Sequence, residues 1–385
     1  MIPYGKQYLD QNDIDSVVEV LKSDFLTQGS AVPEFENNIS HYCSSRYSTA
    51  FNSATSALHS ACLALGLKEG DYLWTSPNTF VASANCAIYC GAKIDFVDID
   101  LDTYNMSVIK LEEKLIKAKK TNTLPKIIIP VHFAGQSCNM KRIHELSKLF
   151  GFSIIEDASH AIGSKYLNQP VGGCLYSDIT VFSFHPVKII TTGEGGIATT
   201  NSSRLNDKMK MIRAHGITRD ARLFKNKINE PWYYEQQTIG FNYRMTDFQA
   251  ALGSSQLLKL DNFVRERYAR KKIYDDALLS LPIFLPTQDE DCYSSLHLYP
   301  IRLNNMETKK SRGEVFNYLR NKGIGVNVHY IPLHIQPFFK KFGFRENDFQ
   351  NAVEYYKNTI SLPIYPKLSL ESQKKVILSL EESLS

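Results

Sequence analysis

Apolar positions along the chain fall into two alternating kinds of segment. At 14–21 and again at 58–65, apolar side chains recur three and four positions apart, which is the spacing of one helix face. Residues 126–131 (KIIIPV) form a continuous apolar run, which is typical of a strand buried on both faces. By the same patterns we expect strands at 72–75, 94–97, 152–156, 179–184 and 196–200, and helices at 79–90, 108–119, 139–150 and 204–213. This alternation predicts a mostly parallel sheet that is covered on both faces.

The last third of the chain has a different pattern. Residues 246–281 predict one unusually long helical stretch, which ends before Pro282. Beyond it we expect strands at 296–303 and 325–330, a helix at 312–322 and two helices at the end of the chain. The sequence therefore predicts a large α/β domain over residues 1–250 and a smaller α+β domain over residues 251–385.

The composition is that of an ordinary globular protein. Of the 385 residues, 43% are hydrophobic and 22% are charged, which excludes a disordered chain. The 44 Lys and Arg residues only slightly outnumber the 40 Asp and Glu residues, so we expect neither a nucleic-acid nor a membrane partner. We also expect no membrane span and no signal peptide. The seven cysteines form no C-x-x-C pair, which predicts reduced thiols and a cytoplasmic location.

Two residues that could take part in catalysis follow neighbouring predicted strands. In open α/β sheets, ligands bind beyond the carboxyl ends of the strands. Asp157 directly follows the strand 152–156, and Lys188 comes 31 residues later, just past the strand 179–184. An acid and a lysine so placed suggest pyridoxal phosphate, whose Schiff-base lysine works with an acid that partners the pyridinium nitrogen. A solvated lysine and a turn-forming acid are the alternatives. Apolar and small residues flank Lys188, which favours the functional interpretation.

Residues 52–57 (NSATSA) join a short predicted strand to a helix. A helix that opens with small and hydroxyl residues presents free backbone N–H groups and the positive end of its dipole, which suit a phosphate group. An ordinary serine or threonine cap is the alternative.

Five segments together resemble the DegT-type sugar-nucleotide aminotransferases, namely FNSATSAL, TSPNTFVASAN, EDASHAIGS, FSFHPVKIITTGEGG and GFNYRMTDFQAALGSSQL. The resemblance runs in order over nearly the whole chain, from LTQG near the start to HLYP and VHYIPLH in the second predicted domain. It implies the type I fold of PLP-dependent transferases, which is aspartate aminotransferase-like. It also implies pyridoxal 5'-phosphate as the cofactor.

Within the family, SFHPVK and VHYIPLH are most similar to the enzymes that aminate C4 of a UDP-linked 4-keto sugar on the pseudaminic acid pathway. The resemblance thus implies transfer of an amino group from L-glutamate to a UDP-linked 4-keto-6-deoxy-N-acetylhexosamine. A C3-keto sugar, or a dTDP- or GDP-linked sugar, is an alternative. Relatives that dehydrate the sugar have His at the lysine position, so Lys188 favours transamination over that alternative.

The family's site residues can be carried onto this sequence position by position. Lys188 would form the Schiff base, Asp157 would keep the ring nitrogen protonated, and His160 would lie beside Asp157 under the ring. The other cofactor contacts would be Phe80 on the ring, the backbone of Ala54 and Thr55 and the Ser183 hydroxyl on the phosphate, and Asn242 from the second subunit of a homodimer. The sugar-nucleotide groove would be lined by Tyr4, Leu26, Thr27, Gln28, Gly29, Arg244, His329 and Tyr330.

Some of these side chains have structural alternatives. Phe80 could belong to the core, and Arg244 could form a structural ion pair, although a sugar diphosphate calls for a guanidinium. His185 is as well explained by a structural role, and Glu194 by the fixing of a turn.

Two further features bear on the prediction. His329 and His334 have no third ligand at zinc-like spacing, so we expect no metal site. Ser254 and Ser255 stand where we expect an apolar residue, a departure that should affect helix packing more than chemistry.

Overall fold

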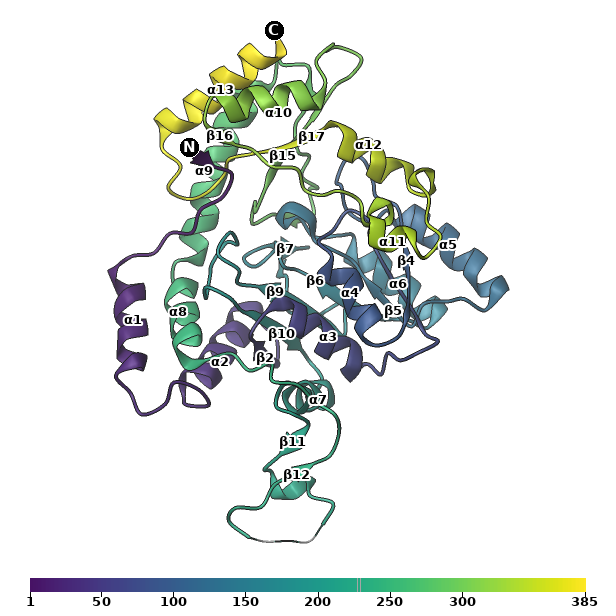
Figure 1. Ribbon diagram of the computed structural model, residues 1–385, viewed down its shortest axis with the longest axis vertical. Coiled ribbons are helices and arrows are strands. Elements are labelled where there is room, and N and C mark those ends of the chain that lie inside the picture. The colour runs from purple at the N-terminus through teal and green to yellow at the C-terminus, as the bar shows by residue number, and fades with distance from the viewer. Residues whose placement is uncertain (227, 229) are drawn as a thin grey trace.

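A seven-stranded sheet forms the centre of the molecule (Figure 1), for which a computed structural model describes residues 1–226, 228 and 230–385. The strand order is β2-β10-β9-β6-β5-β3-β4. The strands are β2 (Tyr47–Phe51), β3 (Tyr72–Thr75), β4 (Lys93–Phe96), β5 (Ile127–Ile129), β6 (Ser153–Asp157), β9 (Ile179–Ser183) and β10 (Gly196–Thr200). β10 is antiparallel to both its neighbours, whereas β9, β6, β5, β3 and β4 run parallel. The predicted mostly parallel sheet is confirmed.

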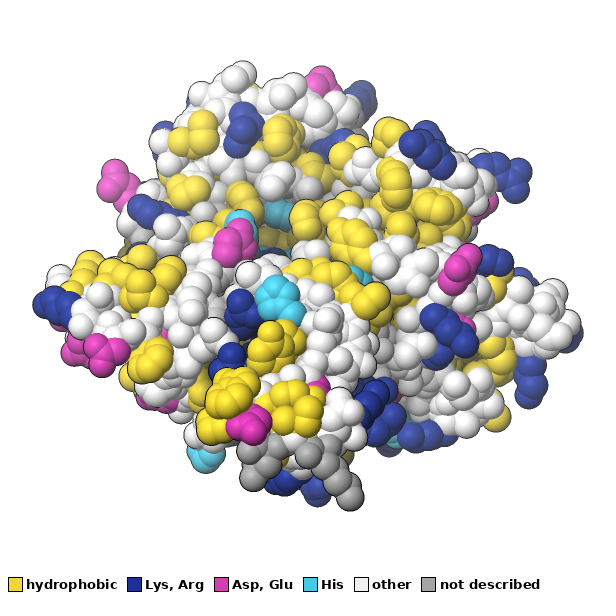
Figure 2. Space-filling view, turned by 60° about the horizontal axis from the view of Figure 1, so that its bottom comes forward, with side chains coloured by type: hydrophobic (Ala, Val, Ile, Leu, Met, Phe, Trp, Pro, Cys, Tyr) yellow, Lys and Arg dark blue, Asp and Glu magenta, His cyan; other side chains and the backbone are white. Residues whose placement is uncertain are grey.

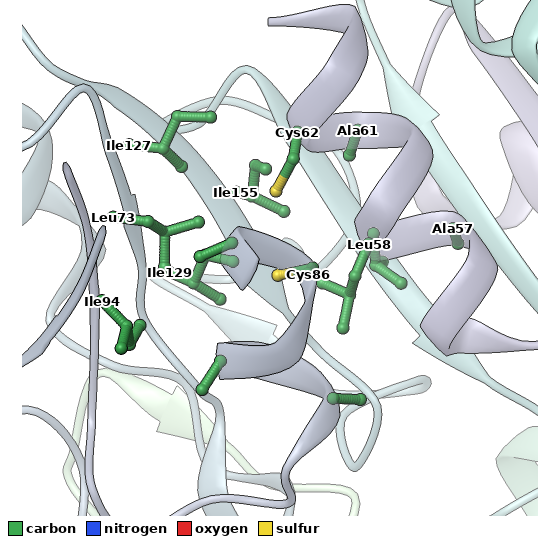
Figure 3. Packing of buried hydrophobic residues seen from close by; sticks show 14 of the residues in the cluster. Ala57, Leu58, Ala61, Cys62, Leu73, Cys86, Ile94, Ile127, Ile129 and Ile155 are labelled. Atoms are coloured by element: carbon green, nitrogen blue, oxygen red, sulfur yellow. The ribbon is translucent and has the colours of Figure 1, made fainter. Parts of the chain in front are cut away.

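Helices cover both faces of the sheet because alternate strand residues point to opposite sides. On one face, Leu73, Ile127, Ile129 and Ile155 pack against α3 (Ala54–Ala64) and α4 (Ala82–Tyr89), as Figure 3 shows, and α7 (Ser203–Arg213) joins the same core. On the other face, the neighbouring residues Trp74, Ile128 and Ile154 pack against α5 (Val108–Thr121) and α6 (Met140–Phe150). α2 (Ala31–Cys43) covers that face beside β2, β9 and β10.

The predicted long helix is two helices, α8 (Asp247–Leu257) and α9 (Leu260–Leu278). α1 (Gln11–Leu21) packs along α8, and the contact is polar at its centre. The buried carboxylate of Asp13 accepts hydrogen bonds from Ser255 Oγ at 2.6 Å and Gln256 Nε2 at 2.8 Å, and it pairs with Lys259 Nζ at 2.6 Å. Ser255 therefore has a defined partner where we expected an apolar side chain.

A smaller unit follows α9 and lies at the top of Figure 1. Its antiparallel sheet has β15 (Tyr299–Leu303) between β13 (Ile283–Phe284) and β17 (Thr359–Leu362). α10 (Arg312–Asn321) and α13 (Leu370–Leu384) pack beside it, and α12 (Gln350–Asn358) and the short α11 (Pro337–Lys340) lie toward the large sheet. The expected domain boundary after residue 250 falls inside α8 and stays a prediction.

The predicted strand at 325–330 is wrong. The strand here is only Ile324–Gly325 (β16), which pairs with the N-terminal strand β1 (Ile2–Pro3). Residues 327–330 instead leave the sheet edge, held by one bridge between Asn327 and Ser361. This course brings residues 327–330 to the carboxyl ends of β6 and β9 in the large sheet.

Two small sheets lie outside these units. One joins β14 (Cys292–Tyr293) to the hairpin of β7 (Lys165–Tyr166) and β8 (Gln169–Pro170). The other, β11 (Ile217–Thr218) and β12 (Glu235–Gln236), projects from the molecule at the bottom of Figure 1. Figure 2 turns this end toward the viewer and shows apolar side chains gathered on it, where Leu223, Trp232, Tyr234 and Ile239 are exposed.

All seven cysteines lie in the described part of the chain and carry free thiols. Over the same residues, the helices are too short or too polar to cross a bilayer.

Candidate active site

A cavity of about 930 Å³ lies at the carboxyl ends of β6 and β9. The start of α3 forms one wall, and residues 327–330 of the smaller unit close the other. Of the predicted site residues, the cavity wall contains Tyr4, Ala54, Thr55, Phe80, Asp157, His160, Ser183, Lys188, His329 and Tyr330. Side chains far apart in the sequence are thus brought around one space.

Asp157 is the last residue of β6, and its carboxylate is held on both oxygens. Oδ2 accepts a hydrogen bond of 2.6 Å from Ser83 Oγ, and Oδ1 accepts from the backbone N–H and the hydroxyl of Ser159 at 3.1 and 2.6 Å. These three hydrogen bonds fix the position of the carboxylate. The sequence reasoning did not single out Ser83 or Ser159, although both stand in the segments TSPNTFVASAN and EDASHAIGS.

Lys188 lies in the loop after β9, with its backbone N–H bonded to His185 O at 2.9 Å. Burial of the ammonium group lowers the pKa of Lys188 to about 8, against the opposing effect of the Asp157 charge. A far larger fraction of this amine is therefore uncharged at neutral pH than for an ordinary lysine. An uncharged amine next to a fixed carboxylate can act as a nucleophile and as a base.

The first turn of α3 faces the cavity with Ala54 and Thr55. Ser53 caps this helix, because its Oγ accepts from the N–H of Ser56 at 3.1 Å. Backbone N–H groups of a first helical turn have no acceptor within the helix, so they are available to an anion. Ser183, at the end of β9, also lines the cavity.

His329 lines the cavity as a buried and anchored side chain. Its Nδ1 lies 2.9 Å from Ser361 Oγ. Burial, and then the charge of Lys188, lower the pKa of His329 to about 3, so this imidazole is neutral. His334 lies apart, with Nε2 at 3.2 Å from Glu346 O. Among the residues that the structure describes, no group of three or more His, Cys, Asp or Glu side chains could hold a metal ion.

The other predicted residues lie outside the cavity wall of their own chain. They are Leu26, Thr27, Gln28, Gly29, Asn242 and Arg244. Leu26 O accepts from the backbone N–H of Asp247 at 2.9 Å, and Gly29 N–H donates to the Asp247 carboxylate at 2.8 Å, so this segment is tied to the start of α8. Asn242 reaches the start of α3 through its backbone, since Asn52 Nδ2 lies 3.4 Å from Asn242 O.

His185 and Glu194 lie at the exposed rim of the cavity. The carbonyl oxygen of Glu194 accepts from Thr192 Oγ1 at 2.7 Å and from Gln249 Nε2 at 2.9 Å. These contacts give the backbone of Glu194 a part in the turn between β9 and β10.

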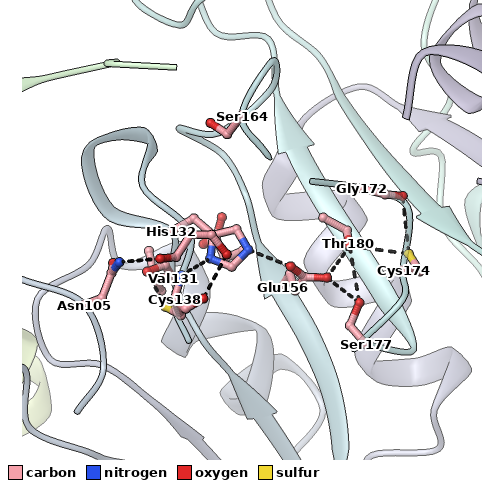
Figure 4. Close-up of polar contacts among 12 residues, drawn as sticks. Asn105, Val131, His132, Cys138, Glu156, Ser164, Gly172, Cys174, Ser177 and Thr180 are labelled. Atoms are coloured by element: carbon pink, nitrogen blue, oxygen red, sulfur yellow. Dashed lines mark hydrogen bonds and ion pairs between the residues drawn. The ribbon is translucent and has the colours of Figure 1, made fainter. Parts of the chain in front are cut away.

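A buried polar network surrounds Glu156, the residue before Asp157 in β6 (Figure 4). His132 Nδ1 accepts from the backbone N–H of Cys138 at 3.1 Å, so the ring hydrogen is on Nε2, which donates to Glu156 Oε2 at 2.6 Å. The His132 backbone N–H also donates to Asp157 O at 3.0 Å. This network ties the loop after β5 to the end of β6, and sequence reasoning missed it.

Comparison with known proteins relates this geometry to a family. Residues 7–381 match the DegT/DnrJ/EryC1/StrS aminotransferase family. The chain belongs to this family. It is 41% identical to the UDP-4-amino-4,6-dideoxy-N-acetyl-beta-L-altrosamine transaminase of Campylobacter jejuni, over 98% of this chain and 96% of that protein.

Solved structures of the family share the fold over the whole chain. PseC of Helicobacter pylori, an aminotransferase involved in the biosynthesis of pseudoaminic acid, superposes with a TM-score of 0.90 at 32% identity, covering 100% of this chain and 99% of that chain. The PLP-form of the putative sugar aminotransferase Spr1654 of Streptococcus pneumoniae gives 0.88 at 29% identity, with 100% of both chains covered. The type I fold of PLP-dependent transferases predicted for this chain is confirmed.

Proposed function

We propose that this family member is a PLP-dependent aminotransferase that moves an amino group from L-glutamate to the C4 keto group of a UDP-linked 4-keto-6-deoxy-N-acetylhexosamine. The observation that carries the proposal is the pair in the cavity floor. Lys188 has an amine whose pKa is lowered to about 8, and Asp157 has a carboxylate fixed by two serines. Such a pair is what pyridoxal phosphate requires of its protein.

The residues of the cavity fit this cofactor. The first turn of α3 and the Ser183 hydroxyl suit its phosphate, and the Phe80 ring, whose side chain is exposed toward the cavity, suits a flat aromatic ligand. Asp157 suits a protonated ring nitrogen. When bound, pyridoxal phosphate supplies an aldehyde that joins covalently to amines and a ring that accepts the electrons released at the substrate carbon.

The chain's own residues then have separate tasks. Lys188 Nζ takes the proton from Cα of the amino donor, which its lowered pKa permits near neutral pH. Asp157 holds the proton on the ring nitrogen, and Ser83 and Ser159 keep its carboxylate in place. The first turn of α3 would hold the phosphate group of the cofactor independently of Lys188.

The relative in Campylobacter jejuni, named for a UDP-linked amino sugar, supports the sugar proposed here. A homodimer with shared sites is proposed because Asn242, Arg244 and residues 26–29 lie outside the cavity of their own chain. A guanidinium delivered from the partner would suit the diphosphate of a sugar nucleotide. We place this enzyme in the cytoplasm, in keeping with its free thiols.

The test begins with the purified protein. Borohydride reduction followed by peptide mapping should place the cofactor on Lys188, and Lys188→Ala should lose the label, whereas the exposed Lys165→Ala should keep it. A glutamate-coupled assay should then give amination of UDP-linked 4-keto sugars. A label on another side chain contradicts the proposal. Turnover of only C3-keto, dTDP- or GDP-linked sugars would move the substrate to those classes, and loss of water without amine transfer would identify a dehydratase.

A further inference from the structure

His160 has a defined proton position because of its surroundings. It is 5% exposed, and its Nδ1 accepts a hydrogen bond of 3.3 Å from the backbone N–H of Ala134. A ring nitrogen that accepts a hydrogen bond carries no hydrogen. Burial, and then the charge of Lys188, lower the pKa of His160 well below 6.5, so the ring is neutral. Its one N–H is therefore on Nε2.

This proton position decides the direction of the next hydrogen bond. His160 Nε2 lies 3.1 Å from Tyr330 Oη, so His160 donates and the Tyr330 oxygen accepts. Burial raises the pKa of Tyr330 well above 10.0, so the phenol keeps its hydrogen. Because His160 cannot accept it, the Tyr330 hydrogen is available to another acceptor in the cavity that both side chains line.

The backbone on both sides of this chain of bonds is fixed. Ala134 has a left-handed backbone (φ 56°), a conformation that is unfavourable for a residue with a Cβ. Next to it, buried Asn105 accepts from the Phe133 N–H at 2.9 Å and donates to Gln136 O at 3.0 Å. On the other side, buried Asn78 accepts from the Tyr330 N–H at 3.1 Å. The direction of the bonds is thus part of the folded structure.

We propose that Tyr330 is a catalytic residue whose hydroxyl donates a hydrogen bond to an oxygen of the bound reactants, with Ala134 and His160 as positioning residues. The acceptor is a phenolic or keto oxygen, and it comes from the cofactor ring or from the sugar. Oxygen acceptors of this kind gain negative charge during transfer of an amino group, and an oriented donor in a water-poor site stabilises that charge. The inference rests on the proposed function, since it requires that the reactants occupy this cavity.

Nitrogen-15 NMR of the loaded enzyme, labelled at histidine, tests the direction of the bonds without reference to activity. His160, assigned by its loss in His160→Gln, should be neutral with hydrogen on Nε2, and Tyr330→Phe should shift the Nε2 signal. A hydrogen on Nδ1, or a doubly protonated ring at pH 7, overturns the inference.

Kinetics and absorbance then identify the acceptor. Tyr330→Phe should keep the cofactor on Lys188 and lower kcat by about ten-fold, the loss expected for one hydrogen bond. A changed absorbance titration of the loaded enzyme assigns the acceptor to the cofactor. An unchanged titration with a slower sugar step alone assigns it to the sugar.

Two variants separate positioning from folding. His160→Gln, whose amide can both accept from Ala134 and donate to Tyr330, should retain most of the activity, whereas His160→Leu should lose as much as Tyr330→Phe. Tyr104→Phe, a buried tyrosine outside the cavity wall, is the matched control. If Tyr330→Phe has the kinetics and absorbance of the wild type, the inference is overturned. The proposed function still stands in that case, provided that borohydride reduction places the cofactor on Lys188.

Discussion

Gly196 lies so close to Ala54 that a Cβ built on Gly196 would be 2.4 Å from the Ala54 nitrogen. The clash would be with backbone, which cannot swing away as a side chain can. The start of β10 therefore packs directly against the first turn of α3, where we propose that the phosphate binds. This close approach explains why the last residue of the motif TTGEGG, Gly196, is a glycine.

Gly196→Ala should consequently displace the start of α3. We expect a loss of about 3 kcal/mol in the free energy of unfolding, as in strongly overpacked cores, together with weaker binding of pyridoxal phosphate. Urea unfolding and cofactor titration measure the two effects. Gly193→Ala is the matched control, because nothing lies within 4 Å of its Cβ and only its positive φ costs about 1 kcal/mol. Equal effects of the two substitutions would contradict the role given to Gly196.

Ser255→Ala should loosen the contact between α1 and α8. The substitution removes one of the donors to the buried Asp13 carboxylate, and hydrogen bonds to charged groups contribute about 1.5–3 kcal/mol. Thermal or urea unfolding of the variant measures the loss. Its neighbour Ser254, whose hydroxyl has only a long contact of 3.5 Å to Asn38, should tolerate alanine with little change. If Ser255→Ala proved as stable as the wild type, the expected apolar residue would have served equally well.

Glu156→Gln should destabilise the protein in a pH-dependent way. Burial raises the pKa of Glu156, but hydrogen bonds from His132, Ser177 and Thr180 outweigh it and hold the pKa below 4.5. A carboxyl whose pKa is lowered by folding stabilises the protein above its unfolded pKa, and this contribution is lost as the pH falls through its folded pKa. The wild type should thus exceed the variant by about 2 kcal/mol at pH 7, with the difference shrinking below pH 4.5.

Urea unfolding of both proteins from pH 7 to pH 3 measures this difference. A constant difference at all pH values would mean that the Glu156 charge makes no contribution. Ser177→Ala, which removes one donor and keeps the carboxylate, should give a smaller loss with the same pH dependence.

Lys188 should react with pyridoxal phosphate at an unusually low pH. Its pKa is lowered to about 8 by burial, so capture by cofactor-free protein should rise about tenfold per pH unit and level off near pH 8. The product trapped by borohydride measures the reaction. Asp157→Asn removes the charge that raises the pKa of Lys188, so its plateau should begin at a lower pH. A rise that continues to pH 10.5, the ordinary value, would show that the amine is solvated.

The proposed shared site predicts that two inactive subunits can complement each other. Random mixing of Lys188→Ala and Arg244→Ala chains should restore about a quarter of the wild-type activity, because about half of the dimers are mixed and each keeps one intact site. Mixing Lys188→Ala with Asp157→Asn should restore nothing, since both residues line the cavity of one chain. Without recovery in the first mixture, Arg244 would belong to the site of its own chain or to none.

Local pattern was sufficient for the central sheet and for the pair at its centre. The run at β5 was recognised because a strand buried on both faces is continuously apolar, and the shorter apolar stretches at β6 and β9 fitted the alternation of strands and helices. Asp157 and Lys188 followed from their places at the ends of such strands. The sequence predicted residues 325–330 as one strand, however, because nothing local indicates that pairing stops after Gly325.

Tertiary structure decided which polar groups meet. Ser83 reaches Asp157, His132 reaches Glu156, and Ala134 reaches His160 only after helices and loops from distant parts of the chain pack over the strand ends. A burial pattern specifies which face of an element is apolar, because that depends on residues three or four positions apart. The partner of a buried hydrogen-bonding group depends on which distant segment of the chain packs beside it. The spacing of apolar residues along the sequence does not specify that segment.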